Sequence, residues 1–159
     1  MRVGVVADSH DRLPAPRAVL ERFEREKLDT IIHAGDFVAP FAAKLLAAYP
    51  GTVYAVYGNN DGERAGLARV LPTLQDGPLW IELAGRRILV HHFIDWCASA
   101  DVQRADVVIT AHTHQVVCER DGERLNLNPG ECCGWLTGKC TAAILRLDTL
   151  TADIFEVHA

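Results

Sequence analysis

The stretch RVGVVADSHD, residues 2–11, sets a pattern that the first half of the chain repeats. Residues 2–7 form a short Val-rich run, and polar residues follow directly, as expected where a buried strand runs into a loop. Beyond Pro14, residues Val19, Leu20 and Phe23 keep helical spacing, with charged side chains on the other face. The stretch therefore predicts a buried strand, a polar loop and an amphipathic helix in that order.

The same unit recurs twice. DTIIHAGD (29–36) and TVYAVY (52–57) are short apolar runs that end in polar loops, and PFAAKLLAAY (40–49) has the composition of a helix. Strands that alternate with helices at this spacing are typical of βαβ units, in which the strands form a parallel sheet with covered faces. The first half of the chain thus predicts a parallel α/β arrangement.

The second half changes character. Turn residues separate pairs of apolar runs, which predicts hairpins over 78–92, 115–127 and 142–157, and a further buried strand is expected over 105–111. The whole predicts a mixed α/β fold, with either one mixed sheet or a two-sheet sandwich and helices outside. We expect residues 1–159 to form one domain, because this length is that of one ordinary domain.

Composition excludes several classes of protein. Apolar residues make up 49% and charged residues 23% of the chain, which is the balance of a soluble globular protein. Without a long apolar run or a signal peptide, a cytoplasmic protein that does not contact the membrane is expected. The net charge of −5 argues against strong binding to nucleic acid. A homo-oligomer stays open.

Five cysteines, an odd number, indicate reduced thiols rather than a disulfide framework. Cys132, Cys133 and Cys140 lie close together in the sequence but form no C-x-x-C pair. We expect small buried apolar side chains here, in preference to a structural zinc site.

Asp, His or Asn side chains follow nearly every predicted buried strand. Ligand sites in α/β sheets lie beyond the carboxyl ends of the strands, so these side chains are expected to meet. Five of the seven histidines in the chain fall in these loops. The residues at these strand ends are Asp8, His10, Asp36, Asn59, His91, His92, His112 and His114.

Each of these motifs alone has an ordinary interpretation. Asp-x-His fits a loop that caps a helix, Gly-Asp is a common turn, and His-x-His occurs on ordinary strands. YGNNDG (57–62) has the composition of a hairpin turn. Leu67, Val70 and Leu71 follow it at helical spacing, however, which weakens the hairpin interpretation. The joint occurrence of these motifs favours a metal site.

The donor set also indicates metal chemistry. With one histidine counted from the His91-His92 pair, the set has two carboxylates, four imidazoles and one amide, which are ligands suited to Mn, Fe, Zn, Co or Ni. Seven donors are too many for one ion and suit two ions bridged by a carboxylate. Two divalent ions against two carboxylates leave a positive site, which an anionic phosphate ester would neutralise.

The order of these motifs, followed by NPG at 128–130, resembles the calcineurin-like metallophosphoesterase superfamily, in particular its small bacterial and archaeal phosphodiesterases. The resemblance covers essentially the whole chain. It implies a four-layer αββα sandwich of two mixed β-sheets flanked by helices. It also implies a metal-dependent phosphodiesterase with a small-molecule phosphate-ester substrate.

The resemblance further implies two divalent transition-metal ions per chain, with Mn preferred and Fe, Zn, Ni or Co as alternatives. A hydroxide that bridges the ions would attack phosphorus. Asn59 and His91 would lie nearest the phosphoryl oxygens and act as catalytic residues. The first ion would be held by Asp8, His10, Asp36 and His114, and the second by Asp36, Asn59, His91 and His112.

This chain departs from the family pattern at several positions. Asn60 stands where larger relatives have a histidine that protonates the leaving group, so that step lacks its usual residue. His92 replaces a glycine and is expected to be an exposed loop histidine, with the missing acid as the alternative. Ala111 replaces a glycine, and Glu131 replaces a serine. If Glu131 faced the pocket, it would repel an anionic substrate.

Other notable residues have structural interpretations. His33 is expected in the core or supporting the site from behind, and Asp61 is expected to cap the helix that starts near residue 63. Trp80, Trp96 and Trp135 are expected in the core or at an interface.

Two alternatives to the phosphodiesterase stay open. One is a non-catalytic scaffold of the same fold, like the retromer subunit that resembles these enzymes. The other is a metal-dependent hydrolase of a non-phosphate substrate. The complete set of ligand positions favours the phosphodiesterase over the scaffold, and the net-positive site favours a phosphate ester over a neutral substrate.

Overall fold

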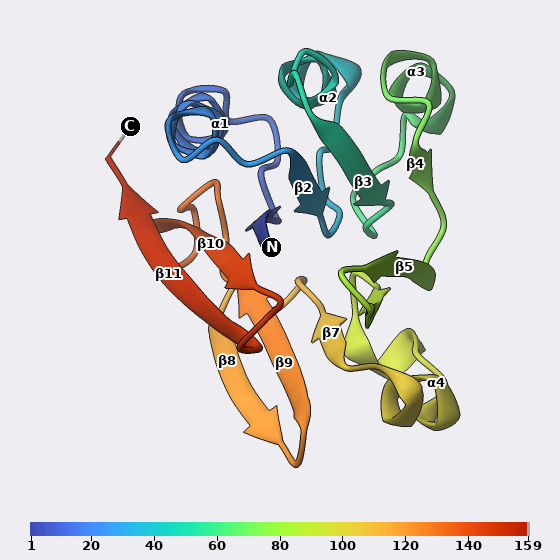
Figure 1. The fold of residues 1–159 in the computed structure, drawn as a ribbon. Coiled ribbons are helices and arrows are strands. Elements are labelled where there is room, and N and C mark those ends of the chain that lie inside the picture. Colours follow the sequence, from blue (N-terminus) through green and yellow to red (C-terminus); the bar gives the residue numbers. More distant parts are fainter. Residues whose placement is uncertain (159) are drawn as a thin grey trace.

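The computed structural model of the protein describes residues 1–158 as two packed β-sheets with helices on both outer faces (Figure 1). This is the four-layer arrangement that the resemblance implied, and of the two alternatives left open by the sequence pattern it is the two-sheet sandwich. The predicted change of character between the two halves corresponds to the start of the second sheet at β5 (Leu79–Leu83), although the last hairpin, β10 (Cys140–Arg146) and β11 (Thr151–Val157), returns to the first sheet.

The first sheet has the strand order β11-β10-β1-β2-β3-β4. Strands β1 to β4 run parallel, and the hairpin of β10 and β11 joins β1 in antiparallel register. Helices α1, α2 and α3 cover the outer face of this sheet (Figure 1). The bounds are β1 Arg2–Val6, α1 Pro14–Arg25, β2 Thr30–His33, α2 Pro40–Ala47, β3 Thr52–Val56, α3 Arg64–Val70, β4 Leu74–Gln75, β10 Cys140–Arg146 and β11 Thr151–Val157.

The second sheet has the order β5-β6-β7-β9-β8. Strands β6, β7 and β9 are parallel, and the hairpin partners β5 and β8 form the two edges. All three predicted hairpins are present. The bounds are β5 Leu79–Leu83, β6 Arg86–Val90, the 3-10 helix η1 Ile94–Trp96, α4 Ser99–Arg104, β7 Val107–Ile109, β8 Val116–Asp121 and β9 Arg124–Pro129.

The core lies in layers that the strand alternation creates. Val5 and Ile32 of the first sheet and Ile88 and Val90 of the second belong to one buried cluster between the sheets. A second buried cluster, which includes Phe23, lies between the first sheet and its helices. The outer face of the second sheet has a smaller buried cluster beside α4. Burial between two sheets fixes the faces of their strands, so the loops at the strand ends are held in register.

The cysteines behave as expected, because all five are free thiols and Cys132, Cys133 and Cys140 are buried. No helix in residues 1–158 is both long and apolar enough to cross a bilayer. The cytoplasmic location and a homo-oligomer stay predictions.

Candidate metal centre

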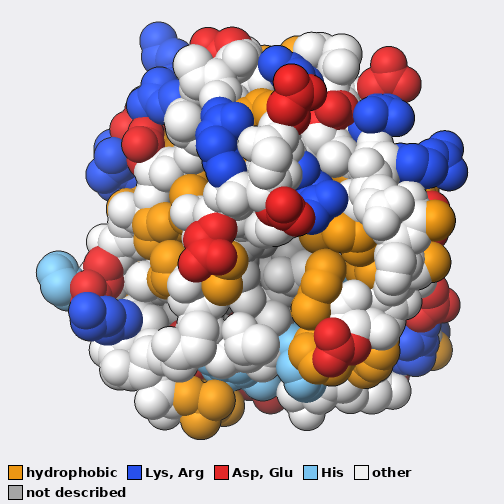
Figure 2. Space-filling view, turned by 90° about the horizontal axis from the view of Figure 1, so that it is seen from below, with side chains coloured by type: hydrophobic (Ala, Val, Ile, Leu, Met, Phe, Trp, Pro, Cys, Tyr) orange, Lys and Arg blue, Asp and Glu red, His pale blue; other side chains and the backbone are white. Residues whose placement is uncertain are grey.

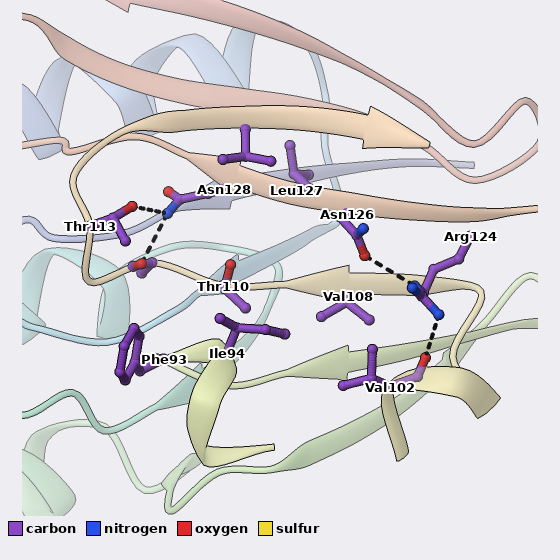
Figure 3. A pocket seen from close by; sticks show the side chains of 12 residues that line it. Phe93, Ile94, Val102, Val108, Thr110, Thr113, Arg124, Asn126, Leu127 and Asn128 are labelled. Atoms are coloured by element: carbon purple, nitrogen blue, oxygen red, sulfur yellow. Dashed lines mark hydrogen bonds between the residues drawn. The ribbon is translucent and has the colours of Figure 1, made fainter. Parts of the chain in front are cut away.

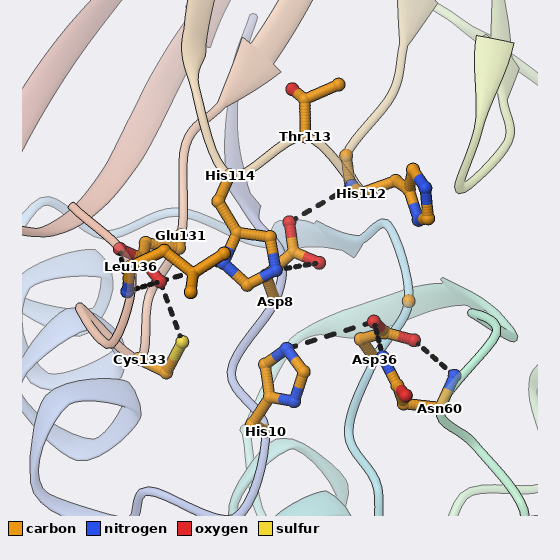
Figure 4. A network of polar contacts seen from close by, with 12 residues as sticks. Asp8, His10, Asp36, Asn60, His112, Thr113, His114, Glu131, Cys133 and Leu136 are labelled. Carbon is orange, nitrogen blue, oxygen red and sulfur yellow. Dashed lines mark hydrogen bonds and ion pairs between the residues drawn. The ribbon is translucent and has the colours of Figure 1, made fainter.

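The candidate site lies at one end of the sandwich, where loops from both sheets meet (Figure 4). The loops after β1, β2 and β3 carry Asp8, His10, Asp36 and Asn59, and the loop after β7 carries His112 and His114. The carboxyl ends of parallel strands meet at one edge, which is why residues this distant in sequence converge.

The backbone of this site is unusual. Asp8, His10, Asp36, His112 and His114 adopt positive φ angles of 46°, 45°, 64°, 67° and 61°. Residues other than glycine rarely adopt this conformation, and where they do the surrounding structure must enforce it. Here hydrogen bonds join the loops, since the Asp8 amide donates to the Gly35 carbonyl at 3.1 Å and the His10 amide to the Asp36 carbonyl at 2.9 Å. Strained backbone of this kind clusters at functional sites.

The first group of donors is buried and incompletely paired. Asp8, His10 and Asp36 offer ligand atoms that all lie within 4.8 Å of one another. Asp8 Oδ1 and His10 Nε2 are buried without a hydrogen-bond partner. His114 Nε2 lies 3.7 Å from Asp8 Oδ1, and His10 Nε2 lies 3.8 Å from Asp36 Oδ2. Unpaired buried polar atoms are costly, and a divalent cation would pair them, so the residues present fit a metal ion.

The electrostatics agree with this fit. Burial raises the pKa of Asp8 to about 6, against the opposing effect of His92 and His114. Burial acts to raise the pKa of Asp36 too, but His92 and Asn60 outweigh it and hold that pKa well below its usual range. Burial lowers the pKa of His10 and of His112, which favours the neutral imidazole that binds metals.

The second group of donors consists of Asn59, His92 and His112, and for His92 the structure differs from the sequence prediction. His92 is completely buried, so the prediction of an exposed loop histidine is wrong. Its Nε2 lies 3.0 Å from Asn59 Oδ1 and 3.4 Å from Asp36 Oδ2, and its Nδ1 donates to the Ala34 carbonyl at 2.8 Å. His112 Nδ1 lies 2.7 Å from the same Asn59 oxygen. Of the two adjacent histidines, the structure therefore brings His92 next to Asn59 and Asp36.

His91 lies elsewhere. Its ring packs against Gly77, where an added Cβ would come within 2.8 Å of the ring, and against Trp96 at a centroid distance of 5.6 Å. Within residues 1–158 it makes no hydrogen bond or ion pair to the other predicted ligands. The geometry thus does not support His91 as a ligand. Strand alternation explains the difference, because Ile88 and Val90 face the first sheet and His92 continues that face.

Glu131 is buried and closed off from solvent. Its carboxylate accepts hydrogen bonds from His114 Nδ1 at 2.8 Å, from Cys133 Sγ at 3.1 Å and from the Trp135 and Leu136 amides at 3.0 Å each. Burial acts to raise its pKa, yet His114 and Thr137 hold the pKa well below its usual range. The carboxylate therefore orients His114 so that Nε2 faces Asp8, an arrangement typical of metal-binding histidines.

Asp61 and Asn60 both hold the Asp36 loop. The Asp61 carboxylate accepts from the amides of Phe37 and Gly58 at 2.7 Å each and of Asp36 at 3.0 Å, so the prediction that it caps α3 is wrong. Asn60 donates its side-chain amide to Asp36 Oδ2 at 2.7 Å and its backbone amide to Oδ1 at 2.9 Å. Sequence reasoning missed both roles, since a turn-rich stretch does not reveal what its side chains contact.

Two further predictions can be compared with the structure. His33 is buried as expected and lies 2.9 Å from Ser9 Oγ, behind the site. None of the three tryptophans lies in the core, since the exposed fractions are 38% for Trp80, 52% for Trp96 and 60% for Trp135, so the placement at an interface stays a prediction. The ring centroid of Trp135 lies 5.6 Å from that of His10, whereas Trp96 lies beside His92 and His112. In Figure 2, histidine side chains at the lower edge of the view lie between groups of hydrophobic side chains.

A separate cavity of about 310 Å³ lies on the outer face of the second sheet (Figure 3). Val108, Leu127 and Ile94 give it apolar walls, and Arg124 with Asn126 forms one end. Phe93, which stacks on His112 at a centroid distance of 4.4 Å, stands between this cavity and the candidate metal centre.

Comparison with known proteins agrees with the site. Residues 1–150 match the calcineurin-like phosphoesterase superfamily domain, and the chain belongs to that family. A phosphodiesterase of Methanocaldococcus jannaschii is 37% identical to it, over 99% of this chain and 98% of that protein. These findings confirm the prediction of a hydrolase. Phosphoesterases of this family use divalent metal ions, and the chain has residue groups that could hold them.

Solved structures show the same fold. An archaeal phosphodiesterase superposes with a TM-score of 0.86 at 33% identity, over 99% of this chain and all of that chain. A single mutant of Vps29 from Entamoeba histolytica superposes with a TM-score of 0.73 at 18% identity, over 99% of this chain and all of that chain. The second likeness shows the fold alone.

Proposed function

We propose that the protein is a dimetal phosphodiesterase that hydrolyses small phosphate diesters. The observation that carries this proposal is the cluster of Asp8, His10 and Asp36, in which Asp8 Oδ1 and His10 Nε2 are buried without partners and all three residues have positive φ angles. The likeness to a phosphodiesterase over nearly the full chain supports the substrate class.

The residues divide between two ion positions that share Asp36. Asp8, His10 and His114 would hold the first ion, and Asn59, His92 and His112 the second. His92 takes the place that the sequence prediction gave to His91, both as a ligand and, with Asn59, as a residue nearest the phosphoryl oxygens. When bound, divalent ions of the Mn, Fe, Zn, Ni or Co type polarise phosphoryl oxygens and lower the pKa of water toward about 7.

The protein itself prepares these donors. Glu131 orients the ring of His114, and the Ala34 carbonyl orients that of His92, so each imidazole directs Nε2 toward the other donors of the site. Asn60 and Asp61 hold the Asp36 loop from the side away from His10. Neutral Asn59 adds an oxygen donor without adding negative charge, so the loaded site stays attractive to an anionic diester.

The test combines metal analysis with hydrolysis of bis(4-nitrophenyl) phosphate. The purified wild type should bind about two ions per chain and cleave the diester when Mn²⁺ is supplied. Asp36→Ala should lose most of both properties, since its carboxylate serves both positions. Absence of metal uptake, or equal hydrolysis by both proteins, would overturn the proposal. A parallel series with Zn²⁺, Ni²⁺, Co²⁺ and Fe²⁺ ranks the metals.

The same experiment decides between the enzyme and a scaffold of the Vps29 kind. A scaffold needs no complete donor set, whereas here the buried donors are present and incompletely paired. Metal uptake without hydrolysis of any diester would favour the scaffold.

A further inference from the structure

A second cavity, of about 470 Å³, opens directly beside the candidate metal centre. Asn59 lines this cavity and also belongs to the candidate metal centre. An ester substituent of a phosphate bound at the second ion position would therefore point toward this cavity. The loop after β3, the start of α3, the loop between β4 and β5, the residue after β6 and the helix η1 supply its walls. The residues that matter are Tyr57, Asn59, Arg64, Asp76, His91 and Trp96.

Trp96 gives this cavity one broad aromatic face. Its ring centroid lies 6.4 Å from that of His92 and 6.3 Å from that of His112, both candidate ligands. Trp96 is 52% exposed, although tryptophan has the largest of the apolar side chains. A tryptophan left open at the edge of a polar site offers a stacking surface for a flat ring.

Other residues that line the cavity are polar. The Arg64 guanidinium lies 3.7 Å above the Tyr57 ring and is paired with Asp76. This pair places guanidinium donors and a carboxylate acceptor side by side at the cavity, which suits the edge of a planar heteroaromatic group. An alkyl chain offers neither a donor nor an acceptor to these groups, so it fits this cavity less well than a heteroaromatic ring does.

We propose that this cavity binds a nucleobase-type heteroaromatic substituent of the phosphodiester, stacked on Trp96 with its edge toward Arg64 and Asp76. The inference rests on the proposed function for the position of the phosphate. It adds a substrate class, because it makes one ester substituent a nucleoside rather than a lipid or a simple alcohol.

The test uses two diesters with the same leaving group, thymidine 5′-(4-nitrophenyl) phosphate and ethyl 4-nitrophenyl phosphate. Stacking of one base on an aromatic residue is worth about 1–3 kcal/mol, so wild type should show a KM at least about fivefold lower for the thymidine diester. Trp96→Leu should raise the KM for that diester toward the ethyl value, with the ethyl diester changed less than about twofold. Trp80→Leu is the matched control, since Trp80 is exposed on β5 and lines neither the cavity nor the metal centre.

A binding measurement keeps the inference separate from catalysis. Calorimetry on the Mn²⁺-loaded protein should show tighter binding of thymidine 5′-monophosphate than of ethyl phosphate, and Trp96→Leu should remove the difference. Equal affinities in wild type, or equal losses for both ligands in the variant, would overturn the inference. Discrimination between the ligands without hydrolysis of either diester would instead overturn the proposed function and leave the base site standing.

Discussion

The two halves of the candidate metal centre are built differently. In the first half the protein fixes the donors, since Glu131 holds His114 and the hydrogen-bonded loops bury Asp8 beside His10. In the second half the donors contact one another, because His92 and His112 both lie within 3.0 Å of Asn59 Oδ1. A site held by the protein is preorganised, whereas a site whose donors pair with each other must break those contacts to bind an ion. We therefore expect the first ion to bind more tightly than the second.

The largest expected effect separates the adjacent histidines of the second half. His92→Ala should lower kcat/KM for bis(4-nitrophenyl) phosphate on the order of 10³-fold, about 4 kcal/mol of transition-state stabilisation, because it removes a ligand. Metal analysis should show one ion retained, the first. His91→Ala is the matched control and should cost less than about tenfold, with both ions kept. Loss of an ion from His91→Ala alone would restore the sequence-based assignment.

Glu131→Gln tests the first half. The amide keeps the size of the side chain but loses the charge that orients His114, so the affinity for the first ion should fall about 10–100-fold. Titration with Mn²⁺ by calorimetry gives both affinities, and the second ion should change much less. Glu119→Gln, an exposed change on β8, is the matched control. If the affinity for the second ion fell as much as the affinity for the first, the two halves of the site would not bind their ions independently.

Sequence reasoning was most successful where local patterns decide structure. The alternation of apolar runs predicted β1, β2 and β3 with their helices, and turn residues predicted all three hairpins. The convergence of Asp8, Asp36 and Asn59 followed from the rule that parallel strands end at one edge. These features depend on periodicity and topology, both of which a sequence carries.

The failures concern which way a side chain faces. Both faces of β6 are apolar, so nothing in RRILVHHF, residues 86–93, reveals which of the two histidines faces the first sheet. Asp61 lies close before a helix and looks like a cap, yet its carboxylate holds amides of the Asp36 loop some 25 residues earlier. Long-range contacts decide such roles, and local propensity does not encode them.

A smaller effect concerns the stability of the metal-free protein. The folded pKa of Asp8 is about 6 against an ordinary value of 3.8, so folded protein keeps a proton that unfolded protein releases. The contribution of the Asp8 carboxyl to the free energy of unfolding therefore falls as pH rises from about 4 to 6. Asp8→Asn removes the charge and tolerates the positive φ, so in chelator it should stabilise the fold above pH 6 by roughly 2 kcal/mol. Near pH 4 the difference should be small.

Urea unfolding in EDTA across this pH range measures the difference between the Asp8→Asn variant and wild type. Mn²⁺ should reverse the order at neutral pH, since only wild type gains binding energy from the first ion. If the variant were less stable than wild type at pH 7 in chelator, the negative charge of Asp8 would not be what destabilises the metal-free fold.

The smallest effect is expected at Asn60, which donates hydrogen bonds to Asp36, the residue that both halves of the site share. Asn60→Ala removes one hydrogen bond to Asp36 Oδ2 but leaves the backbone bond to Oδ1. One such bond is worth about 1 kcal/mol, so kcat should fall about fivefold. Because an amide has no titratable proton, the fall should be the same for diesters with acidic and with poor leaving groups. A loss that grew with leaving-group pKa would instead make Asn60 part of the route by which the leaving group gains its proton.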